Sequence, residues 1–325
     1  MAALIEAKHV KKYFRSPKGT VHAVDDVSMV IEEGTTMGVV GESGCGKTTL
    51  GRALAHMPGA SATDGAIFFE GRDVTTLSGK DLRKYHEDVQ YIFQDPYSSL
   101  DPRKTVRETI EEPLVNTKLY RGKEGKRILE EKVEELMSLV GIDERLANSY
   151  PHELDGGRRQ RVVIARALAL DPKFIVCDEP VSALDVSIQA QVLNLLQDLQ
   201  EKKHLTYMFI THDMSVVRHI SDNISVMYLG QLVETSPAKE LFEKNYHPYT
   251  KALLSAIPST DIYAQNQRIQ MKGEITSPID PKPGCRFAAR CPYACDKCAE
   301  PQKLEEVSPN HFVACCRVRE LNKDL

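Results

Sequence analysis

The glycine-rich segment at residues 41–48 carries residue types whose spacing is suited to binding a phosphate. It contains Gly41, Glu42, Ser43, Gly44, Cys45, Gly46, Lys47 and Thr48, which fits the pattern G-x-x-x-x-G-K-[ST]. Glycines let the backbone curl so that its N–H groups face phosphate oxygens, and a following helix directs its positive end at the same charge. Lys47 can reach the β- and γ-phosphates, and the Thr48 hydroxyl can ligate Mg²⁺.

The context of this segment supports that interpretation. A short apolar run, Thr36–Gly41, precedes it and predicts a buried strand, while TTLGRALAHM after Lys47 predicts a helix. A glycine-rich turn with an exposed lysine is the plain alternative, and the order strand, loop, helix argues against it.

An acidic pair follows a second apolar run and can complete a nucleotide site. Phe174–Cys177 predicts a buried strand, and Asp178 and Glu179 come directly after it. Asp178 can hold Mg²⁺ through water, and Glu179 can orient or deprotonate an attacking water. An acidic pair at a solvent-exposed strand end is common by itself, but it is a weaker explanation beside a phosphate loop. Cys45 and Cys177 are predicted to be small core or loop residues.

Six of the eight cysteines crowd into the C-terminal stretch, at positions 285, 291, 295, 298, 315 and 316. The N-terminus lacks the apolar core of a secretory signal, so we expect a reducing compartment, in which clustered cysteines point to a metal rather than to disulfides. Four thiolates hold either a [4Fe–4S] cluster or tetrahedral Zn²⁺. The spacing Cys295-x2-Cys298 is typical of zinc, and reduced, metal-free thiols are the third alternative.

Composition limits the class of protein that can carry these motifs. The chain has 325 residues, of which 42% are hydrophobic and 27% charged, as in a globular protein of one large or two modest domains. The formal net charge of −4 argues against a strongly basic nucleic-acid binder. No apolar run approaches the roughly 20 residues that span a bilayer, so we expect any membrane role to come through a partner.

Strands and helices alternate along much of the chain, which predicts a parallel sheet covered on both faces. Besides the runs named above, strands are predicted at residues 21–34, 88–93 and 207–211. The helix at residues 187–204 places Val192, Leu195, Leu196 and Leu199 at helical spacing.

Helices dominate the middle of the chain. Lys126–Val140 is amphipathic, with Leu129, Val133, Leu136 and Val140 on one face and Gly141 as a stop, and another helical run follows Gly156. We therefore predict a helical insert at about residues 96–169. After about Ser236 the pattern weakens at Pro248, Pro258, Pro278, Pro281 and Pro283.

Together these motifs resemble the ATP-binding subunit of an ABC transporter over nearly the whole chain, most closely the oligopeptide/dipeptide importer type. Gln94 in YIFQDPYSSLDP resembles the Q-loop, and His212 in ITHD resembles the switch histidine. Leu154-Asp155-Gly156-Gly157-Arg158 lies where the family has its signature LSGGQ, and Ser182-Ala183-Leu184-Asp185 resembles the D-loop. Phe14, with Tyr13 beside it, lies where the family stacks an aromatic ring on adenine.

The resemblance implies an α/β fold with a P-loop NTPase (RecA-like) core, an inserted α-helical subdomain and a small Cys-rich C-terminal extension. Residues 1–235 would form the ATP-binding domain, with the helical subdomain at about 96–169, and residues 236–325 the extension. His247–Pro258 (HPYTKALLSAIP) also resembles the extension of the family.

By the same resemblance, two cassettes meet head to tail, and each ATP lies between the phosphate loop of one and the signature of the other. Nucleotide would contact Tyr13, Phe14, residues 41–49 including Thr49, Gln94 and Asp178, with Mg²⁺ held by Thr48, Gln94 and Asp178. Catalysis would involve Lys47, Gln94, Glu179 and His212. The implied partners are a second ATPase subunit, two permease subunits and, through the complex, an extracellular solute-binding protein. The chain would lie peripherally on the cytoplasmic face of the membrane, without nucleic acid.

The signature departs from the family pattern at Asp155, where the family has serine, and at Arg158, where it has glutamine. A carboxylate about 4 Å from a phosphate oxygen would cost roughly a few kcal/mol at an effective dielectric near 20, and Arg158 and Arg159 could offset part of this. We therefore favour a heterodimer with one competent and one impaired ATP site. The alternative is that Asp155 simply caps the next helix, since Asp serves as well as Ser there.

The cysteine spacing also resembles an element of peptide-importer ATPases that carries a [4Fe–4S] cluster. The resemblance assigns Cys285, Cys291, Cys298 and Cys315 as ligands, with Cys295 and Cys316 as extra residues and zinc as the competing metal. Importers of nickel or oligosaccharides use similar cassettes. A soluble ABC ATPase that acts on DNA or ribosomes, or a regulatory iron–sulfur protein, is a further alternative.

Overall fold

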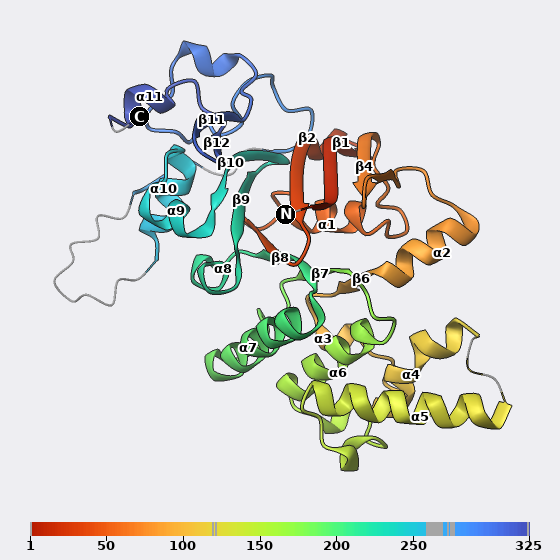
Figure 1. Ribbon diagram of the computed structural model, residues 1–325. Helices are drawn as coiled ribbons and strands as arrows, with labels where there is room; N and C mark the ends of the chain where they lie inside the picture. The colour runs from red at the N-terminus through yellow and green to blue at the C-terminus, as the bar shows by residue number, and fades with distance from the viewer. Residues whose placement is uncertain are drawn as a thin grey trace. The chain divides into compact units, whose positions relative to one another are not determined.

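The computed structural model describes residues 2–118, 120, 122–257, 269–271, 273, 277–323 and 325. Pro258, the last residue of the predicted segment His247–Pro258, lies outside the described residues. The chain divides into two compact units, one formed by residues 1–76 and 208–325 and the other by residues 77–207 (Figure 1). The predicted helical insert, at about residues 96–169, falls within the second unit.

The first unit contains most of the strands. Its elements are β1 (Ala3–Ser16), β2 (Gly19–Glu32), β3 (Thr36–Val40), α1 (Lys47–Leu54), β4 (Asp64–Phe69), β5 (Arg72–Asp73), β8 (Thr206–Thr211, which crosses the boundary between the units), α8 (Met214–Ile220), β9 (Asn223–Tyr228), β10 (Gln231–Pro237), α9 (Ala238–Glu243), α10 (Pro248–Ser255), a 3-10 helix (Asp296–Ala299), β11 (Glu305–Ser308), β12 (His311–Val313) and α11 (Val318–Leu321).

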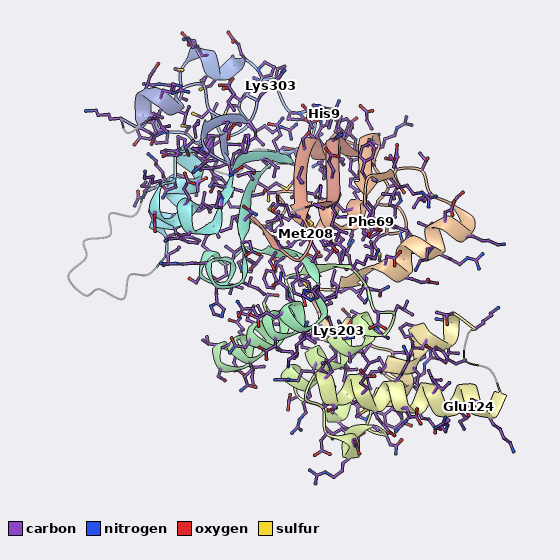
Figure 2. The ribbon with its side chains drawn as sticks, viewed as in Figure 1. His9, Phe69, Glu124, Lys203, Met208 and Lys303 are labelled. Carbon is purple, nitrogen blue, oxygen red and sulfur yellow. The ribbon has the colours of Figure 1, made fainter. Side chains whose placement is uncertain are left out.

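An antiparallel sheet with strand order β2-β1-β4-β5 forms one layer of this unit (Figure 1). The long hairpin of β1 and β2 pairs Phe14 with Val21, and its register shifts between Ala7 and Val10. His9 lies at this irregularity with φ 51° (Figure 2). Its Nδ1 is 2.8 Å from Oδ1 of Asp26. An irregularity of this kind increases the local twist of a strand pair.

The other sheet of the first unit has the neighbours β11-β12-β10-β9-β3-β8. All five residues of β3 are buried, and β3 runs parallel to β9. The predicted buried strand before the phosphate loop is therefore confirmed. A strand buried on both faces reads as a continuous apolar run, which is why the sequence identified it.

The second unit is mostly helical. Its elements are α2 (Gly79–Asp88), β6 (Val89–Ile92), α3 (Pro96–Ser99), α4 (Val106–Asn116), α5 (Gly122–Leu139), two 3-10 helices (Glu144–Leu146 and Pro151–Glu153), α6 (Gly156–Leu168), β7 (Phe174–Asp178) and α7 (Val186–Lys203). β6 and β7 pair in parallel, as the alternating pattern predicted. Among the described residues, no helix combines the length and the apolar character needed to cross a bilayer.

The buried face was predicted correctly for α5 but only in part for α7. The apolar face predicted for residues 126–140 is buried as expected, and Gly141 follows α5 with φ 70°. In α7 the predicted residues Val192, Leu196 and Leu199 are buried, but the predicted Leu195 is only half-buried, and Leu193 is buried in addition. The two leucines lie on different sides of the helix, and only packing decides which side faces the interior.

The C-terminal extension is joined to the sheet of the first unit. The predicted boundary between residues 235 and 236 lies inside β10, which pairs on one side with β9 and on the other with β12 of the extension. A fully buried ion pair connects β10 to β12, because Nε2 of His311 lies 2.8 Å from Oε1 of Glu234. Nδ1 of His311 lies 3.2 Å from Oε1 of Glu240 on α9. Burial alone would lower the pKa of His311, but its bonds to Glu234 and Glu240 outweigh this and raise it.

We expect this pair to make the protein less stable as the pH rises above about 6.5, the ordinary pKa of histidine in an unfolded chain. Above that pH the folded protein keeps a proton that the unfolded chain has lost, so rising pH favours unfolding. The contribution is complete below the unfolded pKa and is lost as the pH passes through the raised pKa of His311. Urea unfolding between about pH 6.5 and 8.5 should show this decline, and His311→Gln should remove it.

His247 has the opposite effect, because burial lowers its pKa to about 4 while the unfolded chain still loses this proton near pH about 6.5, but its contribution is the same in wild type and His311→Gln and cancels when the two are compared. An equal decline in wild type and His311→Gln would contradict the assignment.

Candidate functional site

The phosphate loop connects β3 to α1 in the first unit, and its backbone requires glycine at both ends. Gly41 has φ 154° and Gly46 has φ 107°. A Cβ at Gly41 would approach the carbonyl oxygen of Met227 to 2.1 Å, and one at Gly46 would approach that of Ala23 to 2.0 Å. Any side chain at these positions would therefore force the loop away from its neighbours. Ser43 and Gly44 at the middle of the loop are exposed.

Lys47 begins helix α1 and lies inside the curl of the loop. Its Nζ donates to the carbonyl oxygens of Gly41, at 2.7 Å, and Glu42, at 3.0 Å. The residue is 4% exposed, so its ammonium group is held inside the loop and is shielded from solvent. Thr48 and Thr49 in the first turn of α1 are half-buried. The sequence prediction of strand, loop and helix around Lys47 is confirmed.

Glu42 in this loop has partners that sequence reasoning missed. Its backbone N–H donates to the hydroxyl of Tyr249 at 2.9 Å. Its two carboxylate oxygens accept from Nη1 and Nη2 of Arg290 at 2.7 and 3.1 Å, and this bond raises the pKa of Arg290. Both partners lie more than 200 residues away in the sequence, so no local pattern could have pointed to them.

The two aromatic residues predicted to stack on adenine differ in their surroundings. Phe14 on β1 is 40% exposed, with Nζ of Lys12 5.0 Å from its ring centroid. The hydroxyl of Tyr13 instead donates to Asp25, and its ring stacks on His22. Burial and the hydrogen bond to Asp25 raise the pKa of Tyr13. The open ring of Phe14 is available for stacking, whereas Tyr13 is held within the hairpin.

His212 follows the end of β8, the strand next to β3 in the sheet. The residue is exposed. Asp213 after it caps α8 by accepting from the backbone N–H of Ser215 at 2.7 Å, and its own N–H donates to Oγ1 of Thr211 at 3.0 Å. These bonds fix the backbone on both sides of His212.

In the second unit, the predicted acidic pair lies at the end of β7, and each carboxylate has a defined partner. Asp178 is 2% exposed and accepts from the hydroxyl of Tyr91 at 2.7 Å. Glu179 accepts from Nε2 of Gln94 at 2.9 Å. The structure therefore brings together two residues that the sequence predicted separately. Tyr91 was missed, although it lies in the predicted strand three residues before Gln94.

The backbone at Glu179 is unusual for a residue with a side chain, since its φ is 46°. Its carbonyl oxygen accepts from both Oγ and the backbone N–H of Ser182, at 3.1 and 3.3 Å. A left-handed non-glycine residue costs energy and persists where the surroundings enforce it, often at functional sites. The predicted D-loop therefore helps to hold Glu179 in place, while Asp185 at its end caps α7 by accepting from Ile188 at 3.1 Å.

The predicted signature segment begins helix α6. Oδ1 of Asp155 accepts from the backbone N–H of Arg158 at 2.7 Å, so Asp155 caps the helix as the simpler interpretation predicted. Oδ2 of Asp155 also lies 3.4 Å from Nε of Arg158. Both side chains are more than half exposed, so this ion pair contributes little to stability by itself.

The C-terminal cysteines gather in one region of the first unit. Cys295, Cys298 and Cys316 have sulfur atoms within 4.8 Å of one another. Of the four predicted ligands, only Cys298 belongs to this group. Burial raises the pKa of the other three, Cys285 (to about 11), Cys291 and Cys315, and neighbouring cysteine charges add to each shift. The sulfur atoms of Cys295, Cys298 and Cys316 lie close enough together to ligate one metal ion, and soft thiolates suit zinc or iron–sulfur.

A buried parallel strand, a glycine-rich phosphate loop and a helix, with an acidic strand end, define an ATP-binding cassette of the P-loop NTPase class. Sequence comparison agrees, because residues 24–182 match the ABC transporter family. Residues 233–298 match the family described as oligopeptide/dipeptide transporter, C-terminal region.

Curated relatives make the assignment narrower. The oligopeptide transport ATP-binding protein AppF of Bacillus subtilis is 49% identical over 96% of both chains. OppF of Salmonella typhimurium, with the same description, is 48% identical over 96% of this chain and 93% of its own. This chain belongs to the family of oligopeptide transport ATP-binding proteins of ABC transporters, and it is an ABC-type ATPase.

Solved structures support the fold. A dimeric post-hydrolysis state of an ATP-binding cassette, bound to ADP and Pi, is 29% identical and covers 72% of this chain and 98% of its own, with a TM-score of 0.65. The cbiO1 protein of Clostridium perfringens, part of an ABC transporter complex, is 26% identical over 75% of this chain and 92% of its own, with a TM-score of 0.66.

Proposed function

We propose that this chain binds and hydrolyses ATP to power the import of oligopeptides or dipeptides, as a peripheral subunit bound to two membrane permease subunits. The observation that carries the proposal is the 49% identity over nearly the full length to oligopeptide transport ATP-binding proteins, together with the matching C-terminal region. An extracellular solute-binding protein would deliver the peptide to the permeases.

The roles of the site residues follow from their chemistry. Lys47 and the loop N–H groups would hold the β- and γ-phosphates, and Phe14 would stack on adenine. Thr48, Gln94 and Asp178 would hold Mg²⁺, which when bound would supply positive charge to neutralise the phosphates. Glu179, aided by His212, would orient and deprotonate the attacking water.

Reconstitution tests this function. The chain should co-purify from membranes with two permease subunits, and the complex in vesicles should take up peptide only with MgATP and the solute-binding protein. Uptake of nickel or an oligosaccharide but not of peptide would overturn the substrate class. ATPase activity stimulated by nucleic acid, without membrane partners, would overturn the transport role.

We also infer that the chain acts in a heterodimer in which one ATP site is impaired. The competent site would combine the phosphate loop of this chain with the signature of its partner, and the impaired site would contain Asp155. The carboxylate supports this inference because it would lie near the γ-phosphate, where a family serine donates a hydrogen bond. Of its two oxygens, Oδ1 accepts a short hydrogen bond from the backbone N–H of Arg158, whereas Oδ2 lies 3.4 Å from Nε of that residue.

Asp155→Ser should separate the two interpretations, because serine keeps the helix cap and removes the charge. We expect the ATPase rate of the assembled transporter to rise about twofold or more, as a second site gains a hydroxyl donor worth about 1 kcal/mol. Asp143→Ser, another exposed cap in the second unit, is the matched control and should change nothing. An unchanged rate in Asp155→Ser would leave Asp155 as a helix cap alone.

The cysteine region is proposed to bind a [4Fe–4S] cluster, with zinc as the competing metal. The group when bound would serve as a structural staple, because thiolate sites of this kind stabilise the fold around them. Cys298→Ser should abolish metal binding, since Cys298 belongs both to the predicted set and to the compact thiol group. Loss of metal binding in Cys285→Ser would support the predicted set of ligands. Loss of metal binding in Cys316→Ser would support the compact group instead. Iron, sulfide and zinc analysis with the visible spectrum identifies the metal, and no metal in wild type would refute the proposal.

A further inference from the structure

Two buried arginines extend from the cysteine-bearing segment, residues 285–298, to parts of the nucleotide site. Arg286 follows Cys285 directly, and Arg290 precedes Cys291 directly. Their side chains are only 6% and 8% exposed. A charged side chain is seldom buried unless it has a specific partner, so the partners of these two arginines indicate what the segment does.

Arg290 forms an ion pair with the phosphate loop. Its guanidinium donates to both carboxylate oxygens of Glu42, and Nη1 also lies 3.4 Å from the hydroxyl of Tyr228. The pairing is bidentate, which fixes direction as well as distance. Because Glu42 is one residue from Gly41 and its carbonyl oxygen accepts from Lys47, this contact acts on the part of the loop that holds the lysine.

Arg286 contacts the β1–β2 hairpin, which carries Phe14. Nη2 donates to Oδ2 of Asp25, and Nη1 donates to the carbonyl oxygen of Leu229. Asp25 also accepts from the hydroxyl of Tyr13, the neighbour of the exposed Phe14. One half-buried carboxylate therefore connects the cysteine-bearing segment to the strand that presents the aromatic ring.

The turn at Gly230 links these two contacts. Its backbone N–H donates to the carbonyl oxygen of Cys45 in the phosphate loop at 2.7 Å, and its own carbonyl accepts from the N–H of Asp25 at 2.8 Å. The chain just before residue 285 adds a further contact, because the N–H of His22 donates to the carbonyl oxygen of Pro278 at 3.0 Å. His22 pairs with Tyr13 in the β1–β2 hairpin.

We propose that Arg286 and Arg290 are positioning residues through which the cysteine-bearing segment sets the affinity of this chain for nucleotide. Arg290 orients the phosphate loop through Glu42, and Arg286 orients the strand carrying Phe14 through Asp25. The proposal rests on the ATP-binding function, and it adds that the nucleotide site is incomplete without the C-terminal extension. Neither arginine is a catalytic residue, because each acts through another side chain.

Arg290→Met in the full-length chain tests the proposal, with two readouts that do not depend on hydrolysis. The first is hydrogen exchange of the amides at residues 41–46 without nucleotide, which should become faster. The second is the dissociation constant for MgATP, which should rise about tenfold, within the usual range for coupling between sites. Arg286→Met should likewise speed exchange around residues 13–14 and weaken MgATP binding.

Arg290→Lys provides a second variant in case Arg290→Met does not fold, since lysine keeps the charge but cannot make the bidentate pair. It should fold and show a smaller rise in the dissociation constant. Arg317→Met is the matched control, because Arg317 follows Cys316 but pairs with Glu320 at 2.8 Å and donates to the carbonyl oxygen of Tyr293, and neither partner belongs to the nucleotide site. It should leave both readouts unchanged.

Combining Arg290→Met with Glu42→Gln should weaken MgATP binding no more than the stronger single change, because both remove one interaction. Unchanged exchange and affinity in Arg290→Met and Arg290→Lys, or an equal effect in Arg317→Met, would overturn the proposal while the ATP-binding function stands. Failure of wild type to bind MgATP would instead refute the proposed function, and the exchange measurements would still decide whether Arg290 orders the loop.

Discussion

Glu179→Gln is expected to lower the rate of ATP hydrolysis by about 10²–10⁴-fold, the usual contribution of a general base, while MgATP binding remains close to wild type. An amide has nearly the shape of a carboxylate but cannot accept a proton from water. The partner of Glu179, Nε2 of Gln94 at 2.9 Å, can still donate to the amide oxygen of the new side chain. The left-handed backbone is also retained, because its bonds to Ser182 involve only the carbonyl oxygen of residue 179.

Single-turnover hydrolysis by the assembled transporter, measured beside the dissociation constant for MgATP, separates chemistry from binding. Glu201→Gln, the same change at an exposed position of α7, is the control and should hydrolyse ATP at the wild-type rate. Hydrolysis within about threefold of wild type in Glu179→Gln would show that another group activates the water, and His212 would be the next residue to test.

The second large effect is expected for Lys47→Met, which should reduce hydrolysis by about 10²–10³-fold, as does removal of one preorganised donor from other active sites. Methionine has a similar length but no charge, so the phosphates would lose their buried cation. The carbonyl oxygens of Gly41 and Glu42 would also lose the donor that holds the loop in its curl. We therefore expect the affinity for MgATP to fall as well, unlike in Glu179→Gln.

Equilibrium binding of a fluorescent ATP analogue, with ADP and AMP as competitors, measures this change. Lys239→Met on α9 removes an exposed lysine of the same unit and should have no effect. If Lys47→Met weakened AMP as much as ATP, its charge would not act on the β- and γ-phosphates. Normal affinity for all three nucleotides would contradict the assignment of the phosphate loop.

Much of the site could be predicted because its parts are short and local. The curl from Gly41 to Thr48 needs glycine and lysine at set spacings, and Asp178 and Glu179 must follow a buried strand. Such requirements act over a few residues and are visible in one sequence. The hydrogen bond between Gln94 and Glu179 was not predicted, since 85 residues separate them and each was identified on its own.

In the cysteine region, the spacing in the sequence and the folded structure point to different sets of residues. The resemblance assigned Cys285, Cys291, Cys298 and Cys315, whereas the sulfur atoms that lie within 4.8 Å of one another belong to Cys295, Cys298 and Cys316. The distance between thiols depends on turns such as the 3-10 helix Asp296–Ala299, whose geometry does not follow from cysteine spacing.

The sequence alone determined that this protein has a P-loop nucleotide site, because phosphate binding imposes a local pattern of residues, and the resemblance of its further motifs to ABC cassettes indicated the ABC type. Only the tertiary structure decided that Arg290 holds Glu42 and that Arg286 holds Asp25, 248 and 261 residues away. Ion pairs between such distant residues form only when folding brings both partners together, and arginines and acids are too common in a sequence to identify which of them will pair.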